Sequence, residues 1–218
     1  NVPSFALVRQ WLGKHTPADS KTCLIHNDWR FDNVILAADD PTKVIGVLDW
    51  EMATLGDPLM DLGSALAYWI EEDDNIIMQQ SRRQPTHLKG MMTRDEVVIY
   101  YLEKTGLKID NWTFYEVFGL FRLAGIVQQI YYRYYNKQTS NPAFKNFWII
   151  VHVLHAKCLK LIAQYEGEAL FISHVQPHLQ DMGVDASMIE QLPSPNQTVI
   201  KGILPKSYFG QNTSKAKE

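Results

Sequence analysis

The stretch that decides the fold is HNDWRFDN at residues 26–33, followed by two β-prone runs at residues 34–37 and 44–48. The turn-forming loop ADDPTK at residues 38–43 separates the two runs, and this order predicts a β-hairpin. If the strands pair antiparallel around a centre near Pro41, Asn33 falls roughly opposite Asp49. Both residues then stand at the open end of the ribbon, where Asp28 also arrives. The sequence therefore predicts that two carboxylates and one amide converge there.

Hard oxygen ligands of this kind suit Mg²⁺, which keeps several waters and shares the rest of its coordination with substrate phosphates. A further carboxylate beside the metal can orient or deprotonate an attacking hydroxyl group. An Asp, an Asn five residues later, then a hairpin and a second Asp is also the order of the catalytic and metal residues in protein kinases. The pattern of Asp28, Asn33 and Asp49 thus points to phosphoryl transfer.

The rest of the chain is predicted to be mainly helical, which gives an α+β, mostly α fold. The first helix and a short strand precede the polar stretch, and Asp57-Pro58 is typical of a helix start. Thr93 followed by Glu96 predicts a capping box. The expected helices cover residues 4–14, 58–70, 93–104, 111–136, 143–165 and 169–179, the expected strand covers 22–25, and the acidic run 71–74 is expected to be a solvated break. We expect one lobe over residues 1–190 and a Pro/Ser/Lys-containing tail over 191–218.

Composition excludes some classes of protein. The length of 218 residues suits one domain, and 46% hydrophobic with 21% charged residues is the balance of a globular protein. A net charge of -3 argues against a nucleic-acid binder. No uninterrupted apolar run reaches the length of a membrane span. Cys23 and Cys158 lie in apolar contexts, so we expect buried thiols in a reducing compartment, the cytoplasm, rather than a disulfide.

Two joined patterns carry a resemblance to a known family. H-N-D-x-R-x-x-N is followed by V-L-D-W-E-x-A-x-x-G-D-P-x-x-D-L. Together they resemble the aminoglycoside phosphotransferase/choline kinase superfamily, and most closely the kinase-like domains related to those fused to acyl-CoA dehydrogenases. The resemblance is strong over residues 11–68 and weak in the later helices. It implies the C-terminal lobe of a protein-kinase-like fold, with a small hairpin that carries the catalytic and metal residues.

The resemblance also implies roles for individual residues. Asp28 would be the catalytic base, and Asn33 and Asp49 would bind Mg²⁺ and, through it, ATP. His26 would anchor the loop, and Asp61 would brace it with hydrogen bonds. The residues alone leave purely structural alternatives open. Asp28, Asn33 and Asp49 also fit a set of turn-forming and capping residues, and Asp61 fits the first turn of a surface helix.

Three further residues are candidates for contact with substrate or phosphate. Arg30 either makes such a contact or pairs with Asp32 or Glu51. Glu51 itself suits either a place near the metal or a simple salt bridge. Arg133 lies in the run YYRYY on a predicted helix, where a substrate wall and core packing are both compatible with the sequence.

One part of a complete kinase is missing. Only 25 residues precede His26, and neither G-x-x-x-x-G-K-[ST] nor G-x-G-x-x-G occurs in the chain. We therefore expect that the N-terminal, nucleotide-binding lobe is absent and that this chain alone has little or no kinase activity.

Two functions fit these observations. The first is an ATP- and Mg²⁺-dependent small-molecule kinase that phosphorylates a hydroxyl group. A hydroxyacyl thioester or a similar hydroxy compound is favoured as its substrate over an aminoglycoside. The alternative is a non-catalytic binding or regulatory module that retains a kinase-like lobe. No nucleic-acid or membrane partner is expected, and the sequence does not fix the oligomeric state.

Overall fold

A computed structural model describes residues 2–167 of the chain. The elements are α1 (Ala6–Lys14), β1 (Cys23–Ile25), η1 (Phe31–Asn33), β2 (Val34–Leu36), β3 (Val44–Val47), η2 (Trp50–Met52), β4 (Thr54–Gly56), α2 (Pro58–Leu66), α3 (Ile76–Gln80), α4 (Arg94–Thr105), α5 (Trp112–Tyr135), η3 (Pro142–Phe144) and α6 (Phe147–Glu166). The fold is thus mostly helical with small sheets, as predicted. The predicted helix at 169–179, the end of the predicted lobe at 190 and the tail at 191–218 lie outside the described residues.

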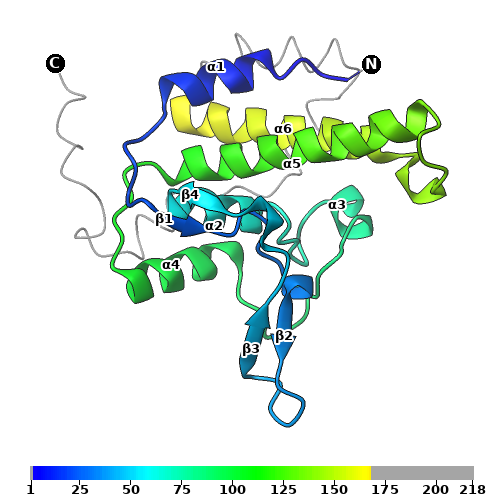
Figure 1. Cartoon of the computed structure of the whole chain (residues 1–218). Coiled ribbons are helices and arrows are strands. Elements are labelled where there is room, and N and C mark those ends of the chain that lie inside the picture. The colour runs from blue at the N-terminus through cyan, green and yellow to red at the C-terminus, as the bar shows by residue number, and fades with distance from the viewer. Residues whose placement is uncertain (1, 168–218) are drawn as a thin grey trace, which may run out of the picture.

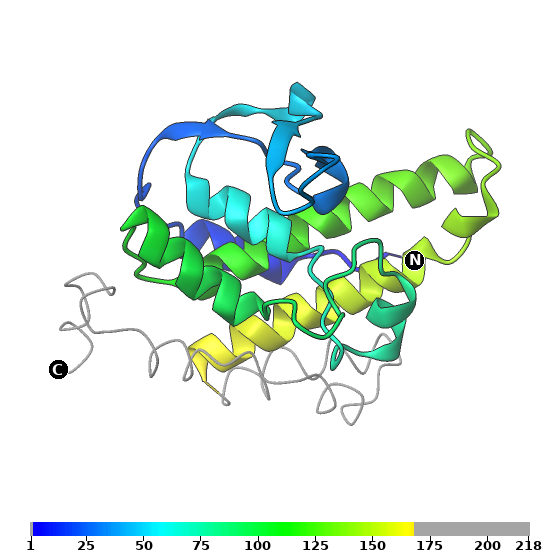
Figure 2. The same cartoon turned by 90° about the horizontal axis from the view of Figure 1, so that it is seen from below.

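The core lies between the long helices α5 and α6, and α1 covers both of them (Figure 1). Val117 from α5, Leu154 and Ile162 from α6, and Val8 from α1 have no exposed surface. The β2–β3 hairpin projects on the side of the molecule opposite to α1 and α6, as both views show (Figures 1 and 2). The helices therefore form the body, and the hairpin with its polar flanks stands at its surface.

Helix α2 crosses α5 at two glycines that allow very close approach. A Cβ atom on Gly63 would lie 2.3 Å from the Tyr115 carbonyl oxygen, and one on Gly119 would lie 2.1 Å from the Gly63 carbonyl oxygen. Since real Cβ atoms do not approach backbone so closely, larger residues would force the helices apart. This crossing fixes α2, which carries Asp57 and Asp61 at its start, against α5.

Asp57 caps α2, as predicted from Asp57-Pro58, and also ties neighbouring segments to it. Its carboxylate accepts hydrogen bonds from the Leu59 N–H at 2.8 Å, from the Ser20 hydroxyl at 2.7 Å and from the Tyr115 hydroxyl at 3.2 Å. Burial, together with the Asp57 charge, raises the pKa of Tyr115. The capping box of Thr93 and Glu96 is present as predicted.

The predicted hairpin is confirmed, but its register differs by one residue. Val34 pairs with Val47 and Ile35 with Gly46, and an irregularity follows between Ile35 and Leu36. The Leu48 N–H donates to the Asn33 carbonyl oxygen at 2.8 Å, so Asn33 faces Leu48 rather than Asp49. At the loop end Leu36 pairs with Val44, so the turn is centred on Asp40 rather than Pro41, and the extra residue of the bulge recovers only half of the resulting difference. The pairing of β1 with β4 was not predicted, because β4 has only three residues.

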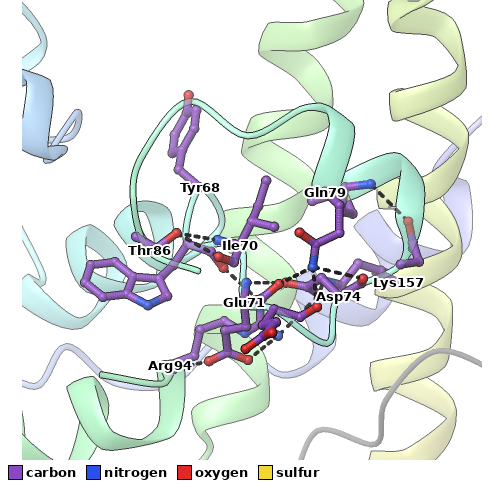
Figure 3. Close-up of polar contacts among 12 residues, drawn as sticks. Tyr68, Ile70, Glu71, Asp74, Gln79, Thr86, Arg94 and Lys157 are labelled. Carbon is purple, nitrogen blue, oxygen red and sulfur yellow. Dashed lines mark hydrogen bonds and ion pairs between the residues drawn. The ribbon is translucent and has the colours of Figure 1, made fainter. Parts of the chain in front are cut away.

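The expectation that residues 71–74 form a solvated break is wrong for its two ends. The Asp74 side chain is 2% exposed and lies 2.6 Å from Arg94 Nη1 and 2.9 Å from Lys157 Nζ. Glu71 lies 2.8 Å from Arg94 Nη2 (Figure 3). Burial alone would raise the pKa of Asp74, but Lys157 and Arg94 lower it to about 2. The long-range partners on α4 and α6 could not be read from the acidic run itself.

Helix α6 and its Cys158 lie in the core, whereas Cys23, which was also expected to be buried, is only half-buried. The segment Pro142–Glu166 is long and apolar enough to cross a membrane, but half of its apolar window is buried inside the fold. It packs along α5, as a core helix does. Cys158 on this helix is buried and Cys23 is half-buried, and both are free thiols.

Candidate active site

The polar loop, residues 26–33, connects β1 to β2, and His26 joins it to the hairpin. His26 Nε2 lies 2.7 Å from the Leu48 carbonyl oxygen, and the Asp28 N–H donates to His26 Nδ1 at 3.2 Å. Since Nδ1 accepts a hydrogen bond, we assign the ring proton to Nε2, which then donates to Leu48. The neutral, buried imidazole thus fixes the start of the loop to the residue before Asp49.

Asp61 and Arg122 hold the same loop from the helical body. Asp61 accepts hydrogen bonds from the His26 N–H at 2.8 Å and the Asn27 N–H at 2.9 Å. Arg122 Nη2 donates to the Asn27 carbonyl oxygen at 2.6 Å. Sequence reasoning missed Arg122, although a lone arginine in the middle of the apolar helix α5 was a usable signal.

Asn27 adopts a left-handed backbone conformation with φ of 65°. Glycine and asparagine are the residues that tolerate this conformation best. The requirement explains why Asn is accommodated at this position. It also orients two successive N–H groups toward the single carboxylate of Asp61.

The structure brings Asp28 and Asn33 into direct contact. Asn33 Nδ2 lies 2.7 Å from the Asp28 carbonyl oxygen and 3.3 Å from Asp28 Oδ2. Asn33 is 6% exposed, whereas the Asp28 side chain retains 21% exposure. Because Nδ2 makes both side-chain bonds of Asn33, Oδ1 is the atom left for a cation. The exposed oxygen of Asp28 can receive a proton from a substrate.

Asp49 follows β3 and has an exposed side chain. Its φ of 65° is also left-handed. Within residues 2–167, Asp49 makes no hydrogen bond or ion pair with Asp28 or Asn33, so the predicted convergence is shown for two of the three groups. No group of three or more His, Cys, Asp or Glu side chains in this range could hold a metal ion. An amide oxygen and a carboxylate are ligand types that suit a hard cation, which would take its other ligands from phosphate and water.

Arg30 lies beside Asp28 and pairs with carboxylates of its own loop. Its Nη2 lies 3.3 Å from Asp32 and 3.7 Å from Asp28, rather than near Glu51. The guanidinium also stands over the Tyr68 ring, 5.4 Å from its centre. Arg30 Nε is buried and has no hydrogen-bond partner. Burial raises the pKa of Tyr68, with a smaller contribution from the Asp28 charge.

Within residues 2–167, the other two candidates make no ion pair with this cluster. Glu51 is exposed on η2. Arg133 is exposed near the C-terminal end of α5, about 16 Å beyond Arg122 along the helix axis. The predicted substrate contacts of these residues therefore gain no support from their positions.

Two cavities border Arg30. A groove of about 390 Å³ has mainly aromatic walls, to which Trp29, Phe31, Trp50 and Trp69 contribute. A second cavity of about 240 Å³ lies between α3, α5 and α6, with Arg30 and Tyr68 in its wall. Concave, apolar spaces next to convergent polar groups are typical of ligand sites.

This fold, with its clamped polar loop, defines the class of kinase-like phosphotransferases, and comparison with known proteins agrees. The model of the phosphotransferase enzyme family matches residues 2–92. A solved structure from Ralstonia eutropha, provisionally described as an aminoglycoside phosphotransferase, superposes with a TM-score of 0.59 at 28% identity. It covers 73% of this chain and 50% of that one.

Curated relatives point the same way. Acyl-CoA dehydrogenase family member 10 of Mus musculus is 38% identical over 143 residues, 65% of this chain and 13% of the relative. Family member 11 of Homo sapiens is 33% identical over 165 residues, 74% of this chain and 21% of the relative. The chain thus spans about a fifth or less of these relatives. Residues 2–92 belong to the phosphotransferase enzyme family, and the resemblance predicted from the sequence is confirmed.

Proposed function

We propose that this chain is the catalytic lobe of an ATP- and Mg²⁺-dependent phosphotransferase that acts on a hydroxyl group of a small molecule. The observation that carries most weight is the contact between Asp28 and Asn33 on a loop that three side chains hold in place. His26, Asp61 and Arg122 all bond to the backbone at residues 26–28 or to the residue before Asp49. Folding alone does not require an exposed carboxylate at the centre of such a loop.

In the proposed reaction, Asp28 accepts the proton of the substrate hydroxyl as that oxygen attacks the γ-phosphorus of ATP. The bond from the γ-phosphorus to the β–γ bridging oxygen breaks, and ADP leaves with that electron pair. Asn33 and Asp49 would hold Mg²⁺, which when bound neutralises charge on the phosphates. His26 and Asp61 keep the loop in place and take no proton.

One face of the hairpin suits the nucleotide base. The register places Asn33, Ile35, Gly46 and Leu48 on the same face, since Ile35 pairs with Gly46 and Asn33 faces Leu48. Ile35 is 42% and Leu48 48% exposed. Gly46 leaves room for the Ile35 side chain, because an added Cβ would lie 3.4 Å from Ile35 Cδ1. An exposed apolar strip beside the metal residues favours a flat ring above it.

The acceptor is proposed to be a hydroxyacyl thioester or another small hydroxy compound. The names of the relatives, acyl-CoA dehydrogenase family members, favour an acyl substrate over an aminoglycoside. We further propose that a nucleotide-binding lobe completes the enzyme, and that the protein works in a reducing compartment such as the cytoplasm, where Cys23 and Cys158 stay as thiols.

Replacement of Asp28 by Asn tests this function. In the natural full-length protein, Asp28→Asn should lower kcat about 10²- to 10⁴-fold, because the proton acceptor is lost while the fold stays intact. The assay is ATP consumption over a panel of small hydroxy compounds. Asp32→Asn is the matched control, since Asp32 belongs to the same loop and also pairs with Arg30 but is 52% exposed.

Two outcomes would contradict the proposal. A near-normal kcat in Asp28→Asn would show that Asp28 is not the catalytic base. Absence of Mg²⁺-ATP binding and of ATP consumption in the full-length protein would favour the non-catalytic module instead.

A further inference from the structure

The cavity between α3, α5 and α6 begins at the polar loop and leads away from it. Arg30 contributes to its wall and lies 3.7 Å from Asp28. Leu123 also lines it and directly follows Arg122, which bonds to the loop. The lining then continues along α5 to Ile130, seven residues or about 10 Å further. A molecule whose hydroxyl lies at Asp28 can therefore extend into the cavity.

The walls of this cavity are mostly aliphatic and aromatic. Val127 from α5 and Phe147 and Ile150 from α6 line its inner part. Its volume is about 240 Å³. At about 30 Å³ for each group of water size, the space corresponds to about eight such groups. The cavity thus has the size and surface for a medium-length aliphatic chain, whose burial is driven by the hydrophobic effect.

The charges at the cavity argue against a cationic ligand. Arg30 and Arg83 both contribute to the wall, and no Asp or Glu lines it. Arg30 Nε is buried without a hydrogen-bond partner. A buried donor of this kind gains from an oxygen acceptor such as a carboxylate or carbonyl. A polyamine sugar would meet two guanidinium groups and find no counter-charge.

We propose that this cavity binds the non-reacting aliphatic chain of the phosphate acceptor and that Arg30 Nε bonds to a carboxylate or carbonyl oxygen of the same molecule. The acceptor is then a hydroxylated aliphatic acid or its thioester. This assignment rests on the proposed function, since it assumes that the acceptor hydroxyl lies at Asp28.

Binding can be measured without phosphoryl transfer. The full-length protein is titrated by calorimetry with unbranched 3-hydroxyalkanoates of about four to twelve carbons and with their N-acetylcysteamine thioesters. Affinity should rise about fourfold for each added methylene, and the rise should end near eleven carbons, when about eight carbons beyond the hydroxyl-bearing carbon fill the cavity. Kanamycin, as a polycationic probe, should not compete. Affinity that is independent of chain length, or competition by kanamycin, would overturn the subsite.

Two adjacent isoleucines on α6 provide a matched pair of variants. Ile150 lines the cavity and Ile149 does not, and both are half-buried. Ile150→Trp should weaken binding of the longest bound chain about tenfold and leave the shortest unchanged, whereas Ile149→Trp should change neither. If Ile150→Trp fails to fold, Ile130→Phe narrows the same cavity from α5. Equal effects of the Ile149 and Ile150 variants would contradict the assignment.

The two arginines at residues 82 and 83 provide a second pair. Arg83 lines the cavity, and Arg82 instead bonds to Gln79. Arg83→Ala should weaken binding of the free acids about threefold to tenfold, and Arg82→Ala should not.

Chain-length-dependent binding without any ATP consumption would overturn the proposed function and keep the subsite. ATP consumption with kanamycin alone would keep phosphoryl transfer and overturn the subsite.

Discussion

Two groups of charged side chains differ in where their counter-charges come from. In the group around Asp74, every contact partner is supplied by the protein: Arg94 from α4 and Lys157 from α6 lie within 2.9 Å (Figure 3). At the candidate active site, Asp49 after β3 is exposed, and Asp28 of the polar loop has its nearest guanidinium at 3.7 Å. The first group neutralises itself inside the fold, whereas the second presents negative charge to solvent.

This difference separates charges that hold the fold from charges that are left for a ligand. A buried ion pair stabilises the fold only when both partners are present, because removing one partner leaves the charge of the other uncompensated. An exposed carboxylate contributes little to stability and is available for a cation or a proton. The four predictions below test whether the two groups separate in this way, and they run from the largest expected effect to the smallest.

Asp74→Ala should lower the free energy of unfolding by about 3 kcal/mol, because the half-buried Lys157 would lose its ion-pair partner and Arg94 would keep only Glu71. Chemical denaturation measures the change. Asp73→Ala is the control, since Asp73 is its exposed neighbour, and its effect should stay within about 0.5 kcal/mol. Equal losses in the two variants would place Asp74 among ordinary surface charges.

Asp61→Ala should cost about 2–3 kcal/mol, because the His26 and Asn27 N–H groups lose a charged acceptor. It should also lower kcat, since the loop that carries Asp28 loses its brace. Denaturation and ATP consumption are measured together. Asp61→Asn keeps one acceptor oxygen and should restore part of both values; full activity in Asp61→Ala would show that the loop holds its shape without it.

Asp49→Asn should weaken the apparent Mg²⁺ affinity of ATP binding about tenfold and leave stability nearly unchanged. Asn is chosen because it tolerates the left-handed backbone at this position, whereas Ala would add strain. A Mg²⁺ titration of nucleotide binding to the full-length protein measures the effect. Asp39→Asn, on the exposed hairpin loop, serves as the control. An unchanged Mg²⁺ dependence of nucleotide binding would show that Asp49 is not a Mg²⁺ ligand.

Glu116→Gln should change the pH dependence of stability. Burial raises the pKa of Glu116 to about 7, although Arg94 opposes this shift. A raised carboxyl pKa favours the protonated folded state, so this contribution is present at low pH and is lost as the pH rises toward 7. Glu116→Gln should therefore be more stable than the wild type at pH 8 and close to it at pH 5. A constant difference across this pH range would contradict the shift.

Much of the fold followed from local signals. The capping pairs at Asp57-Pro58 and at Thr93 with Glu96 predicted helix starts correctly, because a cap needs only neighbouring residues. The long apolar segments predicted α5 and α6, with α6 beginning at Phe147, after a 3₁₀ turn at Pro142–Phe144. The short elements β4 and α3 were missed, because a few residues carry too little periodicity.

The polar loop was predictable to a similar degree. Its residue order predicted the pairing of Asp28 with Asn33, since the two are five residues apart on one loop. The one-residue shift of Asn33 against Leu48 was not predictable, because the residue on which the turn is centred and the bulge after Ile35 both depend on how the hairpin closes. Arg122 and the partners of Asp74 were also missed, since they come from helices far along the chain.

By itself, the sequence determined the hairpin, the helical body and the order of the polar residues, because each depends on spacing over a few residues. The tertiary structure alone decided which charges find a partner. Asp74 and Asp49 are both acidic residues in polar segments, yet two helices bring cations to the first and none to the second in the described part of the chain. Burial and charge pairing are properties of distant segments that fold together, and no local pattern contains them.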